Sequence, residues 1–162
     1  MTTRQEQFER LAMPHTASLL RVARRLLAGS GDAEDLVQET MLLAWRGFHQ
    51  FRAGSNERAW LFQILINAIR ARARKPQPLA AIAEPIERPG FAVALEISQA
   101  LDVLSSEHRE ILLLGVVEEF TCQEISGILA IPMGTVMSRL SRARQALRER
   151  LAPAVRCVGK GT

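Results

Sequence analysis

The chain has 162 residues, 48% of them hydrophobic, which is enough to bury one ordinary core or two small ones. Its net charge of +4 is compatible with a nucleic-acid partner, whereas its 17 acidic residues exclude a simple polycation. No apolar run approaches the roughly 20 residues that span a bilayer, and the N-terminus lacks the apolar core of a signal peptide. We therefore expect a cytoplasmic protein without membrane insertion.

The first 50 residues have the hydrophobic spacing of α-helices and contain no convincing strand. A first helix is predicted from Gln5 to Ala28, kinked or divided at Pro14, and it ends at the glycine-rich residues 29–31. A second helix begins at Asp32, and its apolar stripe consists of Val37, Met41, Ala44, Trp45 and Phe48. Acidic residues in its first turn suit the positive end of the helix dipole, which by itself would explain them.

A turn of small and polar residues, Arg52 to Asn56, leads into a third helix from Glu57 to Lys75. The apolar side of this helix consists of Trp60, Leu61, Ile64, Leu65, Ala68 and Ile69. Its basic end consists of Arg70, Arg72, Arg74 and Lys75. These cations either complement the helix dipole or, with Phe51 and Trp60 near the turn, form a platform for single-stranded nucleic acid. The sequence leaves both interpretations open.

A proline-rich segment, residues 76–91, separates these helices from the rest of the chain. Its prolines, which forbid a continuous helix, are Pro76, Pro78, Pro85 and Pro89. We interpret the segment as a flexible linker between two small helical domains. The alternative is a packed irregular loop within one domain.

The C-terminal part of the chain is also predicted to be helical. A helix is expected from Phe91 to Leu104, and the residues from Ser105 to Glu107 resemble the start of the next helix, His108 to Val117. The core face of that helix is expected to consist of Ile111, Leu112, Leu114 and Val117.

Two further helices joined by a tight turn indicate a helix-turn-helix. A short amphipathic segment, Gln123 to Leu129, with Ile125, Ile128 and Leu129 inward, is followed by a break at residues 130–132. The apolar stripe of the last helix consists of Val136, Leu140, Ala143, Leu147 and Leu151. Its opposite face, which has no acidic residue, consists of Thr135, Ser138, Arg139 and Arg142. Such hydroxyls and arginines contact phosphates and base edges, although an ordinary helical hairpin with a solvated arginine face is the alternative.

Motifs for catalysis or metal binding are not found. Cys122 and Cys157 lie far apart, without the spacing of a zinc site or a disulfide framework. The three histidines are equally scattered, and no local motif joins a nucleophile, a base and an orienting acid. We expect no enzyme activity, no metal or other cofactor and no small-molecule substrate.

Three segments together resemble a known family. They are DAEDLVQETMLLAW at Asp32–Trp45, RAWLFQILINAIRARAR at Arg58–Arg74 and EISGILAIPMGTVMSRLSRARQAL at Glu124–Leu147. In this order they resemble an extracytoplasmic-function (ECF) RNA polymerase sigma factor, the small two-domain branch of the bacterial sigma-70 family.

The resemblance implies an all-α protein of two small domains. A region 2-like domain would occupy residues 1–75, the linker residues 76–91, and a region 4-like helix-turn-helix domain residues 92–156. The family's function implies core RNA polymerase and promoter DNA as partners. It also implies an anti-sigma protein that switches the factor off.

The resemblance also assigns roles to individual residues. Those matching the segment that docks on the clamp helices of the polymerase largest subunit are Asp32, Asp35, Gln38 and Glu39. Those matching the loop and helix that capture the melted minus-ten strand are Phe51, Arg52, Ser55, Asn56, Trp60, Asn67, Arg70, Arg72 and Arg74. Those matching positions that read the minus-thirty-five duplex are Thr135, Ser138, Arg139 and Arg142.

Two residues depart from the family pattern. Met137 stands where a basic residue is usual, and Ala130 where a glycine is frequent, because the end of a helix there favours the left-handed conformation. The first departure removes a phosphate or base contact and the second strains the turn, which leaves open how strongly the second domain grips DNA by itself. Two rival functions remain open: a stand-alone helix-turn-helix regulator, and a sigma-like decoy that binds an anti-sigma protein without touching a promoter.

Overall fold

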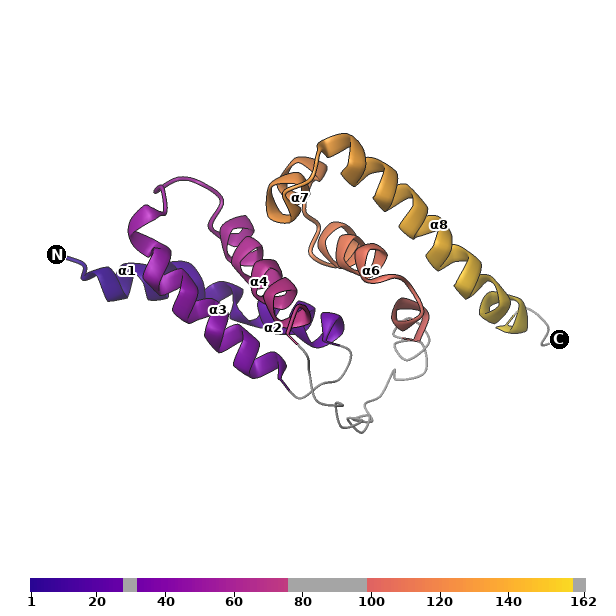
Figure 1. Ribbon diagram of the computed structural model, residues 1–162, viewed down its shortest axis with the longest axis horizontal. Helices are drawn as coiled ribbons and strands as arrows, with labels where there is room; N and C mark the ends of the chain where they lie inside the picture. Colours follow the sequence, from indigo (N-terminus) through magenta and orange to yellow (C-terminus); the bar gives the residue numbers. More distant parts are fainter. Residues whose placement is uncertain (28–31, 76–98, 159–162) are drawn as a thin grey trace. The chain divides into compact units, whose positions relative to one another are not determined.

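The computed structural model describes residues 1–27, 32–75 and 99–158, with side chains as far as residue 152. Every regular element in these ranges is helical, and the helices form two compact units (Figure 1). The predicted all-α fold is therefore confirmed. The helix end expected at residues 29–31 and the linker expected at residues 76–91 lie outside the described residues, and the domain boundaries remain a prediction.

The N-terminal unit contains α1 (Arg4–Ala12), α2 (Thr16–Leu26), α3 (Ala33–Gly47) and α4 (Glu57–Ala73). A 3-10 turn, Met13–His15, separates α1 from α2. Pro14 lies in this turn because proline has no backbone N–H to donate within a helix, and the predicted division is confirmed. A second 3-10 turn, Phe48–Gln50, follows α3.

The core of this unit contains more residues than the apolar stripes predicted from the sequence. Leu36 and Thr40 of α3 and Phe62 and Ile66 of α4 are fully buried, although none was expected to be. The reason is that α4 packs against α1, α2 and α3, so residues around much of its circumference lose contact with water. Trp60, which was placed in the apolar stripe, is only half-buried.

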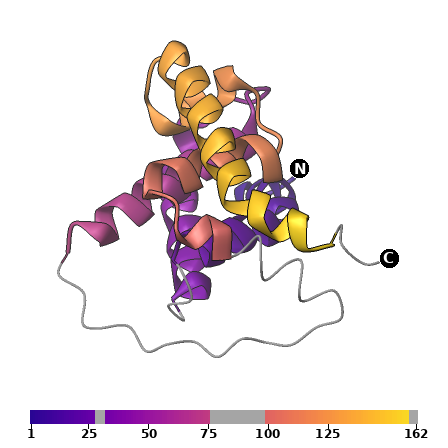
Figure 2. The ribbon, with the colours of Figure 1, turned by 90° about the vertical axis from the view of Figure 1, so that its right-hand side faces the viewer.

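The C-terminal unit contains α6 (Ser106–Leu112), a π-helical turn at Leu113–Val117, α7 (Cys122–Leu129) and α8 (Met133–Val158). α6 packs against α8, the long orange-to-yellow helix of Figure 2. Ser105 is the N-cap of α6, since its hydroxyl accepts a hydrogen bond from the His108 N–H at 3.3 Å, and the predicted helix start is confirmed.

The π-helical turn changes which side of the segment is buried. Leu113 is buried and Val117 is 45% exposed, so the expectation that Val117 lies in the core is wrong. A π-helix has more residues per turn than an α-helix, which rotates the following side chains away from an α-helical pattern. Gly115 allows this turn to approach α8, because a Cβ there would lie 3.2 Å from a methyl carbon of Leu140.

The turn between α7 and α8 has the backbone that the sequence predicted. Ala130 has a φ of 54°, the left-handed conformation that usually selects glycine. The burial of Ile125, Ile128 and Leu129 is confirmed, as is that of Val136 in α8.

Candidate functional site

One face of α3 is polar and exposed. It consists of the predicted residues Asp32, Asp35, Gln38 and Glu39. Leu42, which was not predicted, extends this face by one turn and is 49% exposed. Glu34 is not counted in this face, because its carboxylate accepts a hydrogen bond from Arg24 of α2. This hydrogen bond lowers the pKa of Glu34. The α3 face therefore combines acidic groups with an exposed aliphatic side chain.

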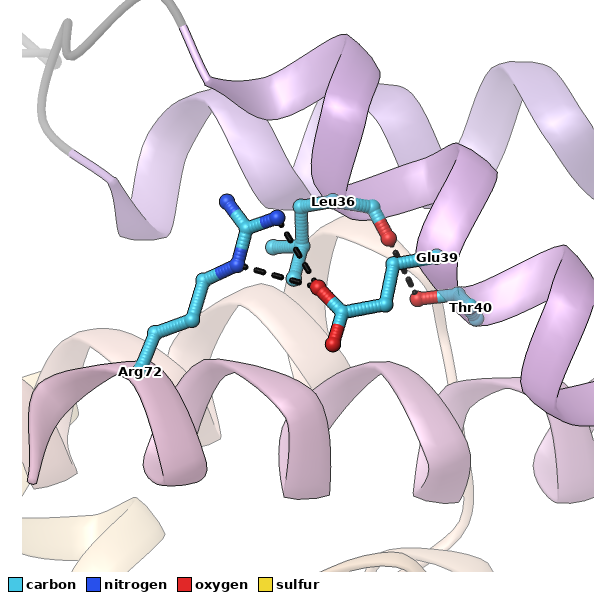
Figure 3. A network of polar contacts seen from close by, with 4 residues as sticks. All are labelled: Leu36, Glu39, Thr40 and Arg72. Carbon is cyan, nitrogen blue, oxygen red and sulfur yellow. Dashed lines mark hydrogen bonds and ion pairs between the residues drawn. The ribbon is translucent and has the colours of Figure 1, made fainter. Parts of the chain in front are cut away.

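Glu39 and Arg72 form an ion pair between α3 and α4 (Figure 3). The Nε and Nη2 atoms of Arg72 lie 3.2 and 2.9 Å from the same carboxylate oxygen of Glu39. On the next residue of α3, the buried Thr40 hydroxyl donates to the Leu36 carbonyl at 2.8 Å. One residue assigned to polymerase docking and one assigned to DNA thus bind each other in this structure.

The aromatic residues near the turn before α4 form a connected group. The ring centroids of Phe51 and Trp60 lie 4.8 Å apart, and Phe51 stacks on Phe48 with an interplanar angle of 15°. Phe8 of α1 contacts Phe48 edge-on. Phe51 and Trp60 are half-buried, so they are supported by the domain core.

The turn itself is held by its own polar side chains. Ser55 donates from its hydroxyl to the Arg52 carbonyl at 2.6 Å, and Gly54 has a φ of 87°. Asn56 is the N-cap of α4, and its side-chain oxygen accepts from the Ala59 N–H at 2.9 Å. Ser55 and Asn56 therefore have structural roles in addition to those expected from the sequence, whereas the Arg52 side chain is exposed.

The arginines at the end of α4 do not all lie on one side of the helix, because Arg70 and Arg74 are four residues apart and Arg72 lies between them. Asn67 is exposed and lies seven residues after Trp60, which places both on one face about 10 Å apart along the helix. Arg74 is exposed and Arg70 is half-buried. Arg72 lies on the side that faces α3, as its pairing with Glu39 requires. The predicted basic set is therefore not one continuous surface.

The outer face of α8 retains most of the predicted features. Arg142 and Ser138 are exposed, and the Ser138 hydroxyl donates to the Thr135 carbonyl at 3.1 Å. Arg139 lies 3.5 Å from a carboxylate oxygen of Glu107 in α6. The sequence showed no acidic residue on this face, but the fold supplies one from another helix.

A groove of about 840 Å³ lies between α1 and the turn before α4. Its lining includes Arg4, Arg10, Phe48, Phe51 and Glu57. The sequence did not indicate it, because α1 has no recognisable motif and the groove forms only when residues about 45 positions apart meet.

In the part of the chain that the structure describes, none of the helices has the length and hydrophobicity that a membrane span requires.

These features define a two-unit helical protein with a helix-turn-helix in its second unit. Comparison with known families assigns both parts: residues 11–77 match Sigma-70 region 2, and residues 94–147 match Sigma-70, region 4.

The chain is similar to several ECF sigma factors. It is 37% identical to EcfG of Rhodopseudomonas palustris, a match covering 75% of this chain and 72% of that protein. It is 32% identical to SigE of Mycolicibacterium smegmatis, covering 90% of this chain and 62% of that protein. Its structure resembles that of RpoE in complex with the anti-sigma factor NepR from Bartonella quintana, with a TM-score of 0.81, 31% identity and coverage of 91% and 98%.

The chain therefore belongs to the ECF RNA polymerase sigma factors of the sigma-70 family. Proteins of this family act in transcription initiation, with core RNA polymerase and promoter DNA as partners.

Proposed function

We propose that this chain directs core RNA polymerase to specific promoters by reading the minus-thirty-five element as duplex and the minus-ten element as melted strand. The observation that carries the minus-ten part of this proposal is the α4 face. Trp60, backed by Phe51, lies beside a turn with exposed Arg52, and the exposed Asn67 lies on the same face about 10 Å further along the helix. An aromatic wall, an amide and a cation are the groups that an unstacked nucleotide needs.

Capture of a base converts binding energy into duplex opening. Unstacking a base costs a few kcal/mol, and stacking on a protein aromatic recovers roughly 1 to 3 kcal/mol. The ring of Phe51 is already fixed between Phe48 and Trp60, so little order is lost when a base arrives.

Polymerase docking is assigned to the polar face of α3. Asp35, Gln38 and Glu39 occupy adjacent turns, and Leu42 supplies an exposed apolar group at the next one. Carboxylates repel DNA and suit a basic protein partner, while a desolvated leucine adds affinity.

The minus-thirty-five element is assigned to the outer face of α8. Arg142 is its most accessible cation, with Ser138 and Thr135 one and two turns away. Arg139 contributes after leaving Glu107. A helix bearing these groups fits the major groove, where arginine bonds guanine and hydroxyls bond several bases.

An anti-sigma protein is proposed as the partner that switches the chain off. One similar solved structure is a complex of this kind, the sigma factor RpoE with the anti-sigma factor NepR. A second similar structure, at 26% identity and a TM-score of 0.73, is CnrH in complex with the cytosolic domain of CnrY.

The direct test is transcription of fragmented genomic DNA by core polymerase with and without this chain, followed by sequencing of new transcript starts. The proposal expects new starts that share two upstream elements at fixed spacing. Tight specific DNA binding without polymerase would favour a stand-alone regulator. A folded chain that binds an anti-sigma protein and yields no new starts would favour the decoy.

A further inference from the structure

The first two turns of α8 expose apolar side chains that the core does not use. Met133 and Met137 are 50% and 58% exposed, whereas Val136 and Leu140 of the same helix are buried. The two methionines are four residues apart, so they lie on one side of α8 in successive turns. An apolar pair of this kind gains free energy when a partner covers it.

These methionines stand where a helix-turn-helix reads bases. α8 begins at Met133, after the turn that follows α7 (Figure 1). In a helix-turn-helix, the N-terminal residues of the second helix contact base edges in the major groove. Gly134 keeps this end open, because a Cβ there would meet no described atom within 4 Å. Ser138, which we assign to the minus-thirty-five element, directly follows Met137, so the methionine pair adjoins the proposed DNA surface.

The charge of this end of α8 suits DNA but does not favour guanine. From Met133 to Arg148 the helix has no acidic residue of its own. Arg139 is the one cation in its first seven residues, and it lies 3.5 Å from a carboxylate oxygen of Glu107. Arginine and lysine make the commonest specific contacts with guanine, and here that chemistry is scarce. The exposed groups at this end are instead thioethers and a hydroxyl.

The C5 methyl group of thymine is the base group that suits a methionine. In the major groove thymine presents this methyl beside its O4 acceptor, and cytosine lacks it. Contact between the methyl group and an apolar side chain removes both from water. Methionine adapts to such a contact, because it is unbranched and its sulfur is polarizable. Met137 borders a cavity of about 290 Å³ that Leu140 also lines, so the core backs one side of it.

We infer that Met133 and Met137 read thymine methyl groups in the minus-thirty-five duplex and are specificity determinants of this chain. The inference rests on the proposed function, since it names the base that this end of α8 selects. It also gives Met137 a role, because an apolar contact with a base takes the place of the basic contact usual at that position. The minus-thirty-five element should therefore contain thymine, on either strand, at one or two neighbouring base pairs.

The test uses the holoenzyme formed with core polymerase and a duplex promoter found by the sequencing experiment. Each thymine of the minus-thirty-five element is replaced in turn by uracil, which lacks only the C5 methyl group. At the contacted positions wild type should bind the uracil duplex about fourfold more weakly, which is the value of one buried methyl group. Met133→Gln and Met137→Gln should each abolish this preference at one position, whereas Met137→Leu should keep it.

Two further variants separate an apolar base contact from other effects. Met13→Gln changes a methionine of the N-terminal unit that is 64% exposed, and it should leave the preference for thymine intact. Arg142→Ala should reduce the slope of log K against log salt by about 0.9, the value for one phosphate contact. Met137→Gln should leave that slope unchanged, because a methionine displaces no counterion.

Three results would overturn the inference alone, each with normal promoter opening by wild type. The first is equal binding of thymine and uracil duplexes by wild type at every position. The second is a preference for thymine that both Met133→Gln and Met137→Gln retain. The third is a shared minus-thirty-five element without any thymine. Absence of new transcript starts with wild type would instead reject the proposed function, and the inference with it.

Discussion

The ion pair between Glu39 and Arg72 allows the link between α3 and α4 to be measured. We consider Glu39→Gln, Arg72→Gln and the double variant, which remove one charge, the other, or both while keeping side chains of similar reach. Arg72 places two nitrogens within 3.2 Å of one oxygen, and its side chain is 24% exposed against 45% for Glu39.

The expected coupling free energy is about 0.5 to 1 kcal/mol. Exposed pairs give roughly 0.2 to 1 kcal/mol, and the two-nitrogen contact of a largely covered arginine places this pair in the upper half of that range. The pair between Arg24 and Glu34 is a matched control, since its side chains are 61% and 53% exposed. Its coupling should fall near the lower limit.

Urea unfolding followed by tryptophan fluorescence is the appropriate assay. Both tryptophans, Trp45 and Trp60, belong to the N-terminal unit, so the signal reports unfolding of that unit. A double-mutant cycle then gives the coupling directly. A coupling indistinguishable from zero, or smaller than that of the Arg24 pair, would refute the reasoning from geometry and exposure.

The remaining predictions concern the assigned surfaces and the turn before α8. Arg142→Ala should weaken promoter binding by the holoenzyme by about 1 to 3 kcal/mol, and unchanged affinity at fixed salt would remove its DNA role. Asp35→Arg should reduce co-elution with core polymerase, with an unchanged circular dichroism spectrum as the folding control. Ala130→Gly should stabilise the C-terminal unit by up to about 1 kcal/mol, because relief of the left-handed conformation exceeds the added chain entropy; slower amide exchange in α7 would support this, and faster exchange would contradict it. Glu107→Gln should strengthen promoter binding up to about fivefold, and weaker binding would count against its pairing with Arg139.

The sequence predicted what depends on local spacing. The division at Pro14, the cap at Ser105 and the left-handed Ala130 follow from residues within one turn of each other, where backbone sterics decide. The π-helical turn could not be predicted from the sequence, because nothing in its five residues, LLGVV, distinguishes a π-helix from an α-helix. Its position depends on the close approach of Gly115 to Leu140, which only the packed unit determines.

The candidate site shows the same division between local and long-range information. The placement of Asp35 and Gln38 on one exposed face was predictable from helical spacing. The pairing of Glu39 with Arg72 joins residues 33 positions apart and was not predictable, because helix packing determines which charges meet. The groove at Arg4 and Arg10 escaped notice for the same reason.

Two of the ion pairs involve arginines assigned to DNA, and they have a common consequence for how the protein would bind it. In the N-terminal unit Arg72 lies against Glu39, and in the C-terminal unit Arg139 lies against Glu107. When either arginine binds a DNA phosphate, it exchanges the carboxylate of its glutamate partner for the phosphate. The net electrostatic gain is therefore smaller than for an arginine without a carboxylate partner. Arg142, exposed on α8, makes no such exchange with the residues described. The largest loss of promoter affinity is therefore expected at Arg142 and a smaller one at Arg139, an order that charge alone would not give.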